Sequence, residues 1–255
     1  MSSPALAIVT GASSGIGAAF ASALAARGHR VLAVARRADR LDELARAAPP
    51  DAVVALPLDL TAAGAVDAVV RRARELGPVD LLVSAAGRGA HGRGWEIPRS
   101  TTAQVLALNV TAGVDLVTAL LPDMVARGRG GLVVVTSAGG FYPSPYLAAY
   151  GASKAFLLSY AEALSAELRG TGVRVMALCP GPVSTEFGEI AGMADLMEGA
   201  PGTMRPEEVA ASALRAFAAG RTVHVPGAVT AVMSGVLARL PRAATRRVAE
   251  RLFRR

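Results

Sequence analysis

The chain has 255 residues, of which 52% are hydrophobic and 18% charged, which excludes an intrinsically disordered protein and allows one substantial core. Its single cysteine, Cys179, cannot form an internal disulfide, so a disulfide-stapled secreted scaffold is excluded and a reducing compartment is expected. Of the 27 basic residues only Lys154 is a lysine, and Asn109 and Gln104 are the only residues of their types. In so arginine-rich a chain, the positions that keep Lys and Asn are candidates for chemistry.

The formal net charge of +7 is concentrated at the C-terminus. Residues 239–255 hold seven Arg and one Glu, which gives +6, and the other 238 residues hold 20 basic and 19 acidic groups, which gives +1. The chain has no basic face interleaved with aromatic residues and no zinc-ligand spacing, so we expect no nucleic-acid partner. The histidines His29, His91 and His224 are scattered, and we expect no bound metal.

The sequence shows no clear targeting or membrane-spanning pattern. The N-terminus, Met1–Pro4, has neither the basic nor the long apolar region of a signal peptide. The longest apolar candidate, Val223–Leu237, is short and contains Pro226 and Gly227. We therefore expect a cytoplasmic protein without a transmembrane segment.

Short β-rich runs alternate with stretches of helical spacing along the chain. The predicted strands are Leu6–Thr10, Val31–Ala35, Val53–Pro57, Leu81–Ser84, Leu132–Ser137, Val173–Leu178 and Thr222–Val225. Helical patterns such as Ala18–Arg27 and Ala62–Leu76 lie between them. Apolar strands that alternate with helices predict a single α/β domain over residues 1–228, with a parallel sheet of seven strands and helices on both faces. Gly188–Met204 is the least regular stretch and predicts a substrate loop over about 186–205.

The first strand leads into a glycine-rich turn, Thr10–Gly17, that opens a helix. In such a turn the first glycine permits a tight bend, the second a close approach to a pyrophosphate, and the third close packing of helix on strand. The N–H groups and the positive dipole end of the helix attract phosphate. A P-loop is excluded because no Gly-Lys-Ser/Thr is present. The residues expected to hold a dinucleotide here are Gly11, Ser13, Ser14, Gly15, Ile16 and Gly17.

The ends of the second and third strands predict which dinucleotide binds. A site that prefers NAD places an acidic residue after the second strand, where it holds the ribose 2′-hydroxyl. Here Arg36 and Arg37 follow the strand, and a guanidinium suits the 2′-phosphate of NADP. We therefore expect NADP(H) to be favoured over NAD(H), with a solvated arginine pair as the competing interpretation, stronger for Arg37. Asp59 and Leu60 follow the third strand, where the carboxylate either accepts from the adenine amino group or caps the next turn.

A second group of candidate residues follows the fifth strand. Ser137 ends that strand, and Tyr150 and Lys154 lie four residues apart at the start of an apolar helix, so they share one helix face. A phenol has a pKa of about 10, and a nearby ammonium together with an oxidised nicotinamide would lower this pKa. We expect Tyr150 to be the acid–base group and Ser137 to hold the substrate oxygen beside it. Tyr142 and Tyr146 lack a basic residue four positions on and are predicted to line the pocket or pack in the loop.

These motifs together resemble those of the classical short-chain dehydrogenase/reductase family, over about residues 4–227. Thr10–Gly17 matches the glycine turn of the family, Ser137, Tyr150 and Lys154 its catalytic triad, Asn109 its fourth catalytic residue, and Pro180–Thr185 its loop that holds the nicotinamide carboxamide. One motif departs from the family pattern. The usual Asn-Asn-Ala-Gly after the fourth strand is Ser84–Gly87 here, which removes both amides and puts a structural hydrogen bond in doubt.

The resemblance implies a Rossmann-type, doubly wound fold and an NADP(H)-dependent oxidoreductase that interconverts a carbonyl and an alcohol. Tyr150 would be the general acid or base, and Lys154 would lower its pKa and bind the nicotinamide ribose. Asn109, through a helix kink and a water, would link Lys154 to a proton relay, while the cofactor carries the hydride. The further cofactor contacts that it implies are Ala86, Gly87, Asn109, Tyr150, Lys154, Pro180, Gly181, Val183 and Thr185. The family also implies a homodimer or homotetramer.

Two other functions compete with this prediction. A catalytically silent NADP-binding regulatory or scaffold protein of the same fold is the alternative, and the complete set of four catalytic residues argues against it. An epimerase or dehydratase of the extended relatives would need a differently spaced glycine turn and a longer substrate domain.

The predicted substrate loop is rich in flexible apolar side chains. Ile190, Met193, Leu196, Met197 and Met204 predict either ordinary packing or a pocket for a flexible apolar substrate. Further candidates for its border are Trp95, Phe141, Tyr142 and Tyr146. We expect a hydrophobic ketone or alcohol as substrate, and a packing role for Cys179 rather than a nucleophilic one.

Residues 229–255 predict a basic amphipathic helical extension. An apolar helical stripe runs through Val229, Val232, Met233, Val236, Leu237 and Leu240. A second helix pattern with most of the arginines follows Pro241. Three interpretations compete: docking on the chain's own domain, a contact between subunits, and attachment to an anionic membrane. Docking and subunit contact are the more economical of these.

Overall fold

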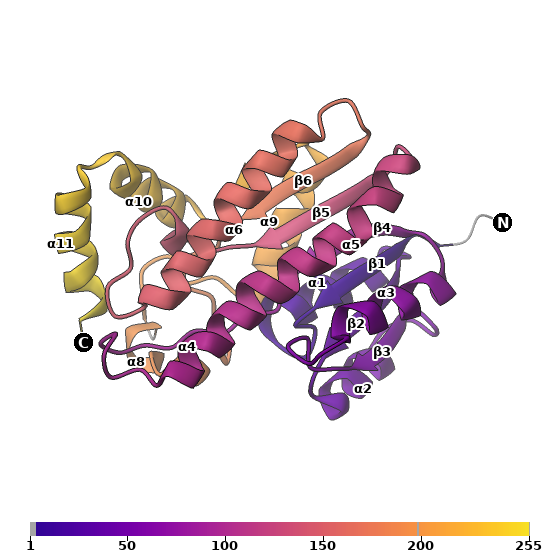
Figure 1. Cartoon of the computed structure of the whole chain (residues 1–255), viewed down its shortest axis with the longest axis horizontal. Coiled ribbons are helices and arrows are strands. Elements are labelled where there is room, and N and C mark those ends of the chain that lie inside the picture. Colours follow the sequence, from indigo (N-terminus) through magenta and orange to yellow (C-terminus); the bar gives the residue numbers. More distant parts are fainter. Residues whose placement is uncertain (1–3, 198, 255) are drawn as a thin grey trace.

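The computed structural model describes residues 4–197 and 199–254, so the predictions that include Met1–Ser3, Glu198 and Arg255 extend beyond the described residues. Strands and helices alternate along the chain (Figure 1). The strands are β1 (Leu6–Thr10), β2 (Arg30–Ala35), β3 (Val53–Pro57), β4 (Val79–Ser84), β5 (Gly130–Val135), β6 (Val173–Leu178) and β7 (Val223–His224). All seven strands were predicted, and the observed bounds differ from the predicted ones by at most two residues.

Helices connect the strands and follow the last one. The longer helices are α1 (Gly15–Ala25), α2 (Ala38–Ala47), α3 (Ala65–Leu76), α4 (Arg99–Leu106), α5 (Ala112–Ala126), α6 (Ala148–Glu167), α9 (Pro206–Ala218), α10 (Ala228–Arg239) and α11 (Arg242–Phe253). The short ones are η1 (Ala107–Thr111), η2 (Ala138–Gly140), α7 (Phe187–Ala191) and α8 (Ala194–Met197).

The strands form one parallel sheet in the order β3-β2-β1-β4-β5-β6-β7. The predicted α/β, doubly wound architecture is therefore confirmed. The chain moves outward from β1 to β3 and then returns to place β4 on the other side of β1. In sheets of this kind the crevice between such strands opens at their carboxyl ends and is where ligands bind. The glycine-rich turn follows β1 and the departing motif Ser84–Gly87 follows β4, so both lie at this crevice.

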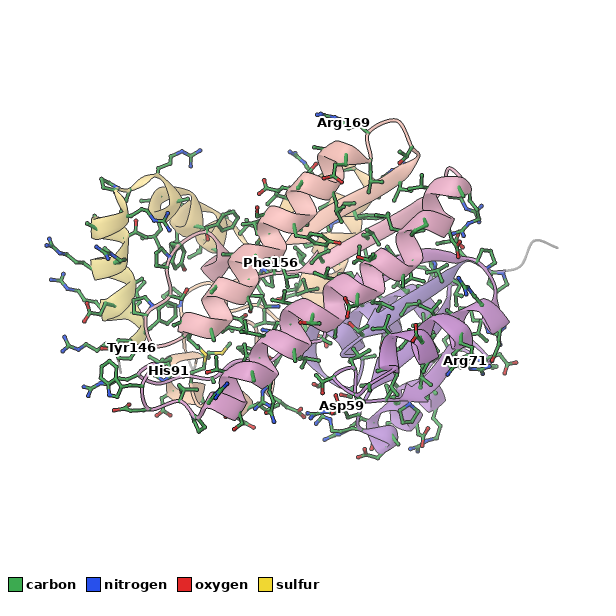
Figure 2. The ribbon with its side chains drawn as sticks, in the orientation of Figure 1. Asp59, Arg71, His91, Tyr146, Phe156 and Arg169 are labelled. Carbon is green, nitrogen blue, oxygen red and sulfur yellow. The ribbon has the colours of Figure 1, made fainter. Side chains whose placement is uncertain are left out.

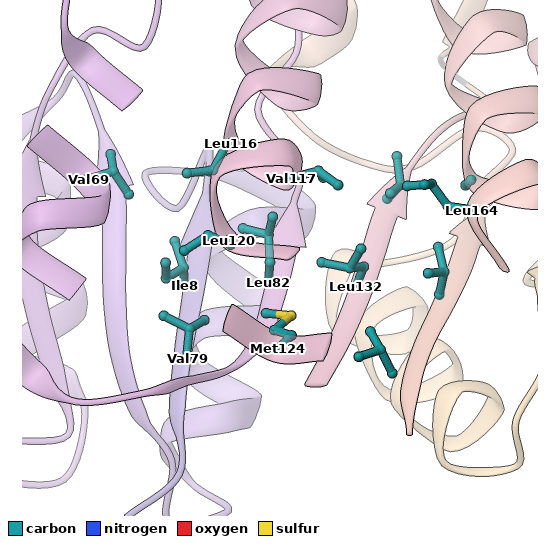
Figure 3. Close-up of a cluster of buried hydrophobic side chains, with 14 of the residues drawn as sticks. Ile8, Val69, Val79, Leu82, Leu116, Val117, Leu120, Met124, Leu132 and Leu164 are labelled. Carbon is teal, nitrogen blue, oxygen red and sulfur yellow. The ribbon is translucent and has the colours of Figure 1, made fainter. Parts of the chain in front are cut away.

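Each face of the sheet buries its own core cluster. On one face Ile8, Leu82 and Leu132, from three neighbouring strands, pack against Leu116 and Met124 of α5 (Figure 3). On the other face strand residues pack with side chains of α1, α2 and α9, such as Phe20, Leu41 and Val209. The strands read as continuous apolar runs because both of their faces are covered. This two-sided burial holds the strand ends, and hence the crevice, in place.

The segment Arg99–Ala126 is continuous helix through α4, η1 and α5, and by length and composition it could cross a membrane. The expectation that no segment of that kind exists is therefore wrong on those two criteria. Leu116, Val117 and Leu120 of this segment are buried in the core against the sheet, as in the central helix of a globular domain. Its apolar composition is explained by that packing.

The predicted substrate loop is more regular than expected, because it contains α7 and α8. These two short helices pack on each other, and the missing side chain at Gly188 makes room for Met197. The loop periodicity was hard to read because each helix has five residues or fewer.

The extension docks on the chain itself, but with the opposite face from the one its apolar stripe predicts. Of that stripe only Leu237 is buried, whereas the small polar residues Thr230 and Ser234 of α10 face inward. Gly181, in the loop after β6, permits this because any side chain there would collide with Thr230. Figure 1 shows α10 and α11 together at the end of the molecule away from β3.

Replacing Gly17 by alanine should lower the free energy of unfolding by about 2 kcal/mol, because the new Cβ would collide with the carbonyl oxygen of Gly11. Elsewhere inside a helix the same change stabilises by up to about 1 kcal/mol. Chemical denaturation measures the difference. Gly94→Ala is the matched control because a Cβ there meets nothing within 4 Å, and it should change stability by less than about 0.5 kcal/mol. Equal losses in both variants would contradict the prediction.

Candidate active site

A cavity of about 1070 Å³ opens at the carboxyl ends of the central strands. Apart from Asn109, the predicted cofactor and catalytic residues all line it. They are Gly11, Ser13, Ser14, Gly15, Ile16, Gly17, Arg36, Arg37, Asp59, Leu60, Ala86, Gly87, Ser137, Tyr150, Lys154, Pro180, Gly181, Val183 and Thr185. The topology therefore collects into one cavity side chains that come from every part of the first 185 residues.

The glycine turn forms a cradle that only a backbone without side chains can make. Gly11 and Gly15 have φ angles of +68° and +53°, in the left-handed region that glycine adopts freely. A Cβ on Gly11 would lie 2.9 Å from the Cα of Ala86, and one on Gly15 would lie 2.9 Å from Cγ2 of Thr185. The N-terminus of α1 points its free N–H groups into the same space. These features fit the pyrophosphate of a dinucleotide.

Thr10 compensates for the departing motif after β4. Its hydroxyl oxygen accepts hydrogen bonds from the backbone N–H groups of Ala85 (3.0 Å) and Ala86 (3.1 Å). The loop is thus held next to Gly11 from β1 rather than by side-chain amides of its own. The hydrogen bond that was in doubt from the sequence is replaced by two to Thr10.

The two arginines after β2 have different surroundings. Arg37 donates to the hydroxyl of Ser13 at 3.3 Å and forms an ion pair with Glu186 at 2.8 Å, which joins the glycine turn to the loop before α7. The Arg36 side chain is 72% exposed, and its nearest acidic group is Asp59 at 4.0 Å. Asp59 itself accepts from the N–H and hydroxyl of Thr61, and these hydrogen bonds hold its pKa below the ordinary value. Arg36 is therefore the guanidinium that remains available to an anionic ligand.

Lys154 is only 4% exposed, on the inner face of α6. Its ammonium donates to the carbonyl oxygen of Val135 at 2.8 Å, at the end of β5. Burial lowers the pKa of Lys154 from 10.5 to about 8. The side chain is thus close to its titration point at neutral to mildly alkaline pH.

Tyr150 lies beside this lysine and Ser137. The Lys154 ammonium is 5.7 Å from the centre of the Tyr150 ring, and the ring packs against that of Phe187 at 5.2 Å between centres. In the chain alone, burial raises the pKa of Tyr150, and a hydrogen bond with Ser137 opposes this. The expected lowering of the phenol pKa by Lys154 is thus absent in the chain alone, because the ammonium faces the Val135 carbonyl and burial disfavours a phenolate.

Asn109 lies behind the cavity wall in the π-helical turn η1, which is the helix kink that the resemblance implies. Its side-chain N–H₂ donates to the Arg88 carbonyl and to the Ser153 hydroxyl, both at 3.0 Å, and its oxygen accepts from the Arg88 N–H at 2.8 Å. Ser153 in turn donates to the carbonyl of Tyr150 at 2.6 Å. Asn109 therefore touches the loop after β4 and the start of α6 rather than the cavity itself. Ser153 was missed in the sequence, although it lies within the Tyr150–Lys154 motif.

The far end of the cavity is apolar. Of the predicted pocket residues, Tyr142, Ile190, Met193, Leu196 and Met197 line it. The others do not. Met204 packs on Gly227, Phe141 on the core, Tyr146 against His91, and Trp95 is 81% exposed.

The sequence did not indicate that the extension forms a wall of this cavity. Met233 of α10 and Leu252 and Phe253 of α11 line it together with Arg251. The carbonyl oxygen of Phe253 lies 2.8 Å from Nε2 of His91, and Figure 2 shows His91 and Tyr146 next to the end of α11. Because 162 residues separate the two partners, no local pattern could have predicted the contact.

Two minor candidates from the sequence were also located. Cys179 is buried, its sulfur lies 3.0 Å from the Thr136 hydroxyl, and burial raises the pKa of its thiol to about 11, as suits a packing residue. Within residues 4–197 and 199–254, no three His, Cys, Asp or Glu side chains gather as metal ligands would.

The buried lysine predicts a pH dependence of stability in the protein without cofactor. Because folding lowers the pKa of Lys154 from its ordinary 10.5 to about 8, the unfolded chain binds more protons between these pH values, and the free energy of unfolding rises with pH. The lysine's contribution should rise by about 2 kcal/mol from about pH 7 to about pH 9.5. Urea denaturation of the wild type and of Lys154→Met at both pH values measures it. Parallel pH profiles of the two proteins would contradict the prediction.

Comparison with known proteins places this geometry. A family model described as short chain dehydrogenase matches residues 5–192. An uncharacterized oxidoreductase of Myxococcus xanthus (strain DK1622) is 43% identical over 185 residues, which make up 71% of this chain and 73% of that protein.

Two solved structures share the fold over nearly the whole chain. A short-chain dehydrogenase from Sphingobium yanoikuyae in complex with NADPH has a TM-score of 0.82 and 32% identity, and covers 94% of this chain and 97% of its own. A short chain dehydrogenase/reductase from Burkholderia phymatum in complex with NAD has a TM-score of 0.84 and 26% identity, and covers 92% and 94%. Both nicotinamide cofactors thus occur among proteins of this fold. The chain therefore belongs to the short-chain dehydrogenase family and is an oxidoreductase that acts on CH–OH groups.

Proposed function

We propose that this protein is an NADP(H)-dependent oxidoreductase that interconverts a hydrophobic ketone and its alcohol. The observation that carries the proposal is the meeting of Ser137, Tyr150 and Lys154 in one cavity, between the glycine cradle and the apolar end. A carbonyl carbon placed there has an acid–base group and a hydroxyl on one side and space for a nicotinamide on the other. When bound, the cofactor supplies or accepts the hydride.

Tyr150 holds and transfers the proton in this proposal. In reduction its phenol hydroxyl donates to the substrate oxygen, and in oxidation its phenolate accepts from the alcohol. The ring is held by Phe187, and the hydrogen bond with Ser137 places a hydroxyl beside the phenol for the substrate oxygen. Because burial raises the pKa of Tyr150 in the chain alone, a phenolate needs additional positive charge, which an oxidised nicotinamide provides together with Lys154.

Lys154 and Asn109 have separate tasks. Lys154 would hold the ribose hydroxyls of the nicotinamide half, since its ammonium lies at the cavity wall 2.8 Å from the Val135 carbonyl. Asn109 is a positioning residue, because its hydrogen bonds end on the Arg88 backbone and on Ser153. Through Ser153 it fixes the first turn of α6, on which Tyr150 lies.

The preference for NADP(H) is supported by charge at the end of β2. The adenosine end of the cavity is bordered by Arg36 and Arg37, and the carboxylate of Glu186 already neutralises Arg37. Arg36 is free to meet a 2′-phosphate, and no acidic side chain follows β2 directly to hold a 2′-hydroxyl.

The substrate class and the assembly are proposed from apolar surfaces. The apolar cavity end, lined by Met193, Leu196 and Met197, supports a flexible hydrophobic substrate. Leu106 of α4 and Phe156 of α6 are large exposed apolar side chains on the two contacting helices, and they support a homodimer or homotetramer.

Tyr150→Phe should reduce kcat/KM for any accepted ketone by about 10²- to 10⁴-fold, because it removes the proton donor without changing the packing of the ring. Binding of NADPH, followed by cofactor fluorescence, should stay within about threefold of the wild type. Tyr142→Phe is the matched control, since Tyr142 is the other phenol that lines the cavity, and it should retain activity. Unchanged turnover in Tyr150→Phe would exclude the proposed acid and favour a catalytically silent protein.

Arg36→Ala should weaken NADPH binding by about tenfold and leave NADH binding unchanged, because the lost charge-assisted contact involves only the 2′-phosphate. Fluorescence titration with both cofactors measures the ratio. Arg40→Ala removes a neighbouring arginine that lies outside the cavity lining, and it serves as the control for a general change in charge. An equal loss for NADH and NADPH would show that Arg36 does not select the cofactor.

A further inference from the structure

Helix α10 presents a wholly apolar face to solvent. Eleven consecutive residues, Ala228–Ala238, carry no charge. Val232 and Val236 are 66% and 55% exposed, and Val229, Met233 and Leu240 are also exposed on the same side of the helix. A contiguous apolar patch of this kind on a folded chain marks an interaction surface.

This orientation is fixed by specific contacts on the inner side of the helix. Thr230 packs against Gly181, and Leu237 is buried with Ser234. The hydroxyl of Thr245 in α11 donates to the carbonyl of Leu237 at 3.1 Å, which holds the two helices together. The apolar residues therefore face outward because the small polar side of α10 is the one that fits the domain.

The neighbouring helix supplies the charge. Arg239, at the end of α10, and Arg242, Arg246, Arg247, Arg251 and Arg254 of α11 are all exposed. Over the full chain, residues 239–255 account for +6 of the net charge of +7. Two short segments thus combine an apolar helix face with a concentrated positive charge.

We propose that the α10–α11 surface, defined as Ala228–Phe253, docks this protein on the surface of an anionic lipid bilayer. Stable attachment of a peripheral protein takes two signals, and here they are an apolar face that enters the headgroup region and arginines that bind anionic headgroups. The occupant is chosen by charge complementarity. A second copy fits less well, because a twofold contact on this surface would bring the two arginine-rich helices together.

The surface adjoins the candidate active site. Met233 and Leu252 line the cavity, while Val232 and Val236 of the same α10 face outward. Docking would therefore bring the apolar end of the cavity next to the bilayer, from which a hydrophobic substrate could enter. This last step rests on the proposed function, whereas the docking itself needs neither cofactor nor substrate.

Cosedimentation of the full chain with vesicles tests the inference without any measurement of activity. The wild type should bind vesicles of phosphatidylcholine with about 30% phosphatidylglycerol at least tenfold more strongly than pure phosphatidylcholine vesicles, and binding should weaken as salt rises from about 0.1 M to about 0.5 M. Val232→Ser/Val236→Ser removes apolar surface, and Arg246→Glu/Arg247→Glu reverses charge. Each double variant should lower the partition coefficient by about tenfold or more.

Arg71→Glu/Arg169→Glu is the matched control, because it makes the same change of charge at two exposed arginines outside α10 and α11 and should retain binding. Circular dichroism and thermal melting establish that every variant folds. Equal binding to both vesicle types, or an equal loss in the control, would overturn the proposal. If no variant alters vesicle binding and the α10 or α11 changes instead split an oligomer in sedimentation velocity, the surface is a subunit contact. Loss of turnover in Tyr150→Phe would leave vesicle binding intact, so the two proposals fail separately.

Discussion

The active-site end of this molecule depends on one buried interaction, the hydrogen bond from the Lys154 ammonium to the Val135 carbonyl. A buried ammonium is costly unless a polar partner compensates for lost water, and burial lowers the pKa of this lysine to about 8. The bond ties the start of α6 to the end of β5, so that Tyr150 is held at the strand ends. The only lysine of the chain is thus both a part of the structure and the positive charge nearest to the phenol.

The same economy governs the loops around the cavity, since side chains of the core elements hold their backbones. Thr10 at the end of β1 takes two N–H groups of the loop after β4, and Asn109 binds the N–H and carbonyl of Arg88 in that loop. A π-helical turn aims Asn109 at these groups, where an unbroken α-helix would turn it elsewhere. The departure from the family motif after β4 is tolerated because its support comes from neighbouring elements. Preorganisation of this kind is what a proton transfer between fixed groups requires.

The two ends of the cavity differ in their physical character. Arg36 and the helix N-terminus of α1 make the nucleotide end cationic, whereas α7, α8 and the terminal helices make the other end apolar. The ion pair between Arg37 and Glu186 crosses between them and joins the glycine turn to the segment that leads into α7. A charged cofactor and an apolar substrate would thus meet at Tyr150, each in the environment that suits it. The exposed apolar face of α10 extends the second environment to the surface.

The sequence by itself determined the features that depend on near neighbours in the chain. Apolar runs located all seven strands, and the spacing of Tyr150 and Lys154 placed both on one helix face, because strand and helix periodicity are local properties. Tertiary structure alone decided that α10 turns its small polar side inward, that Glu186 meets Arg37, and that Phe253 reaches His91. It also decided that burial raises the pKa of Tyr150 in the chain alone. These outcomes depend on packing between residues far apart in the chain, where the fit of surfaces and the loss of water outweigh any local pattern.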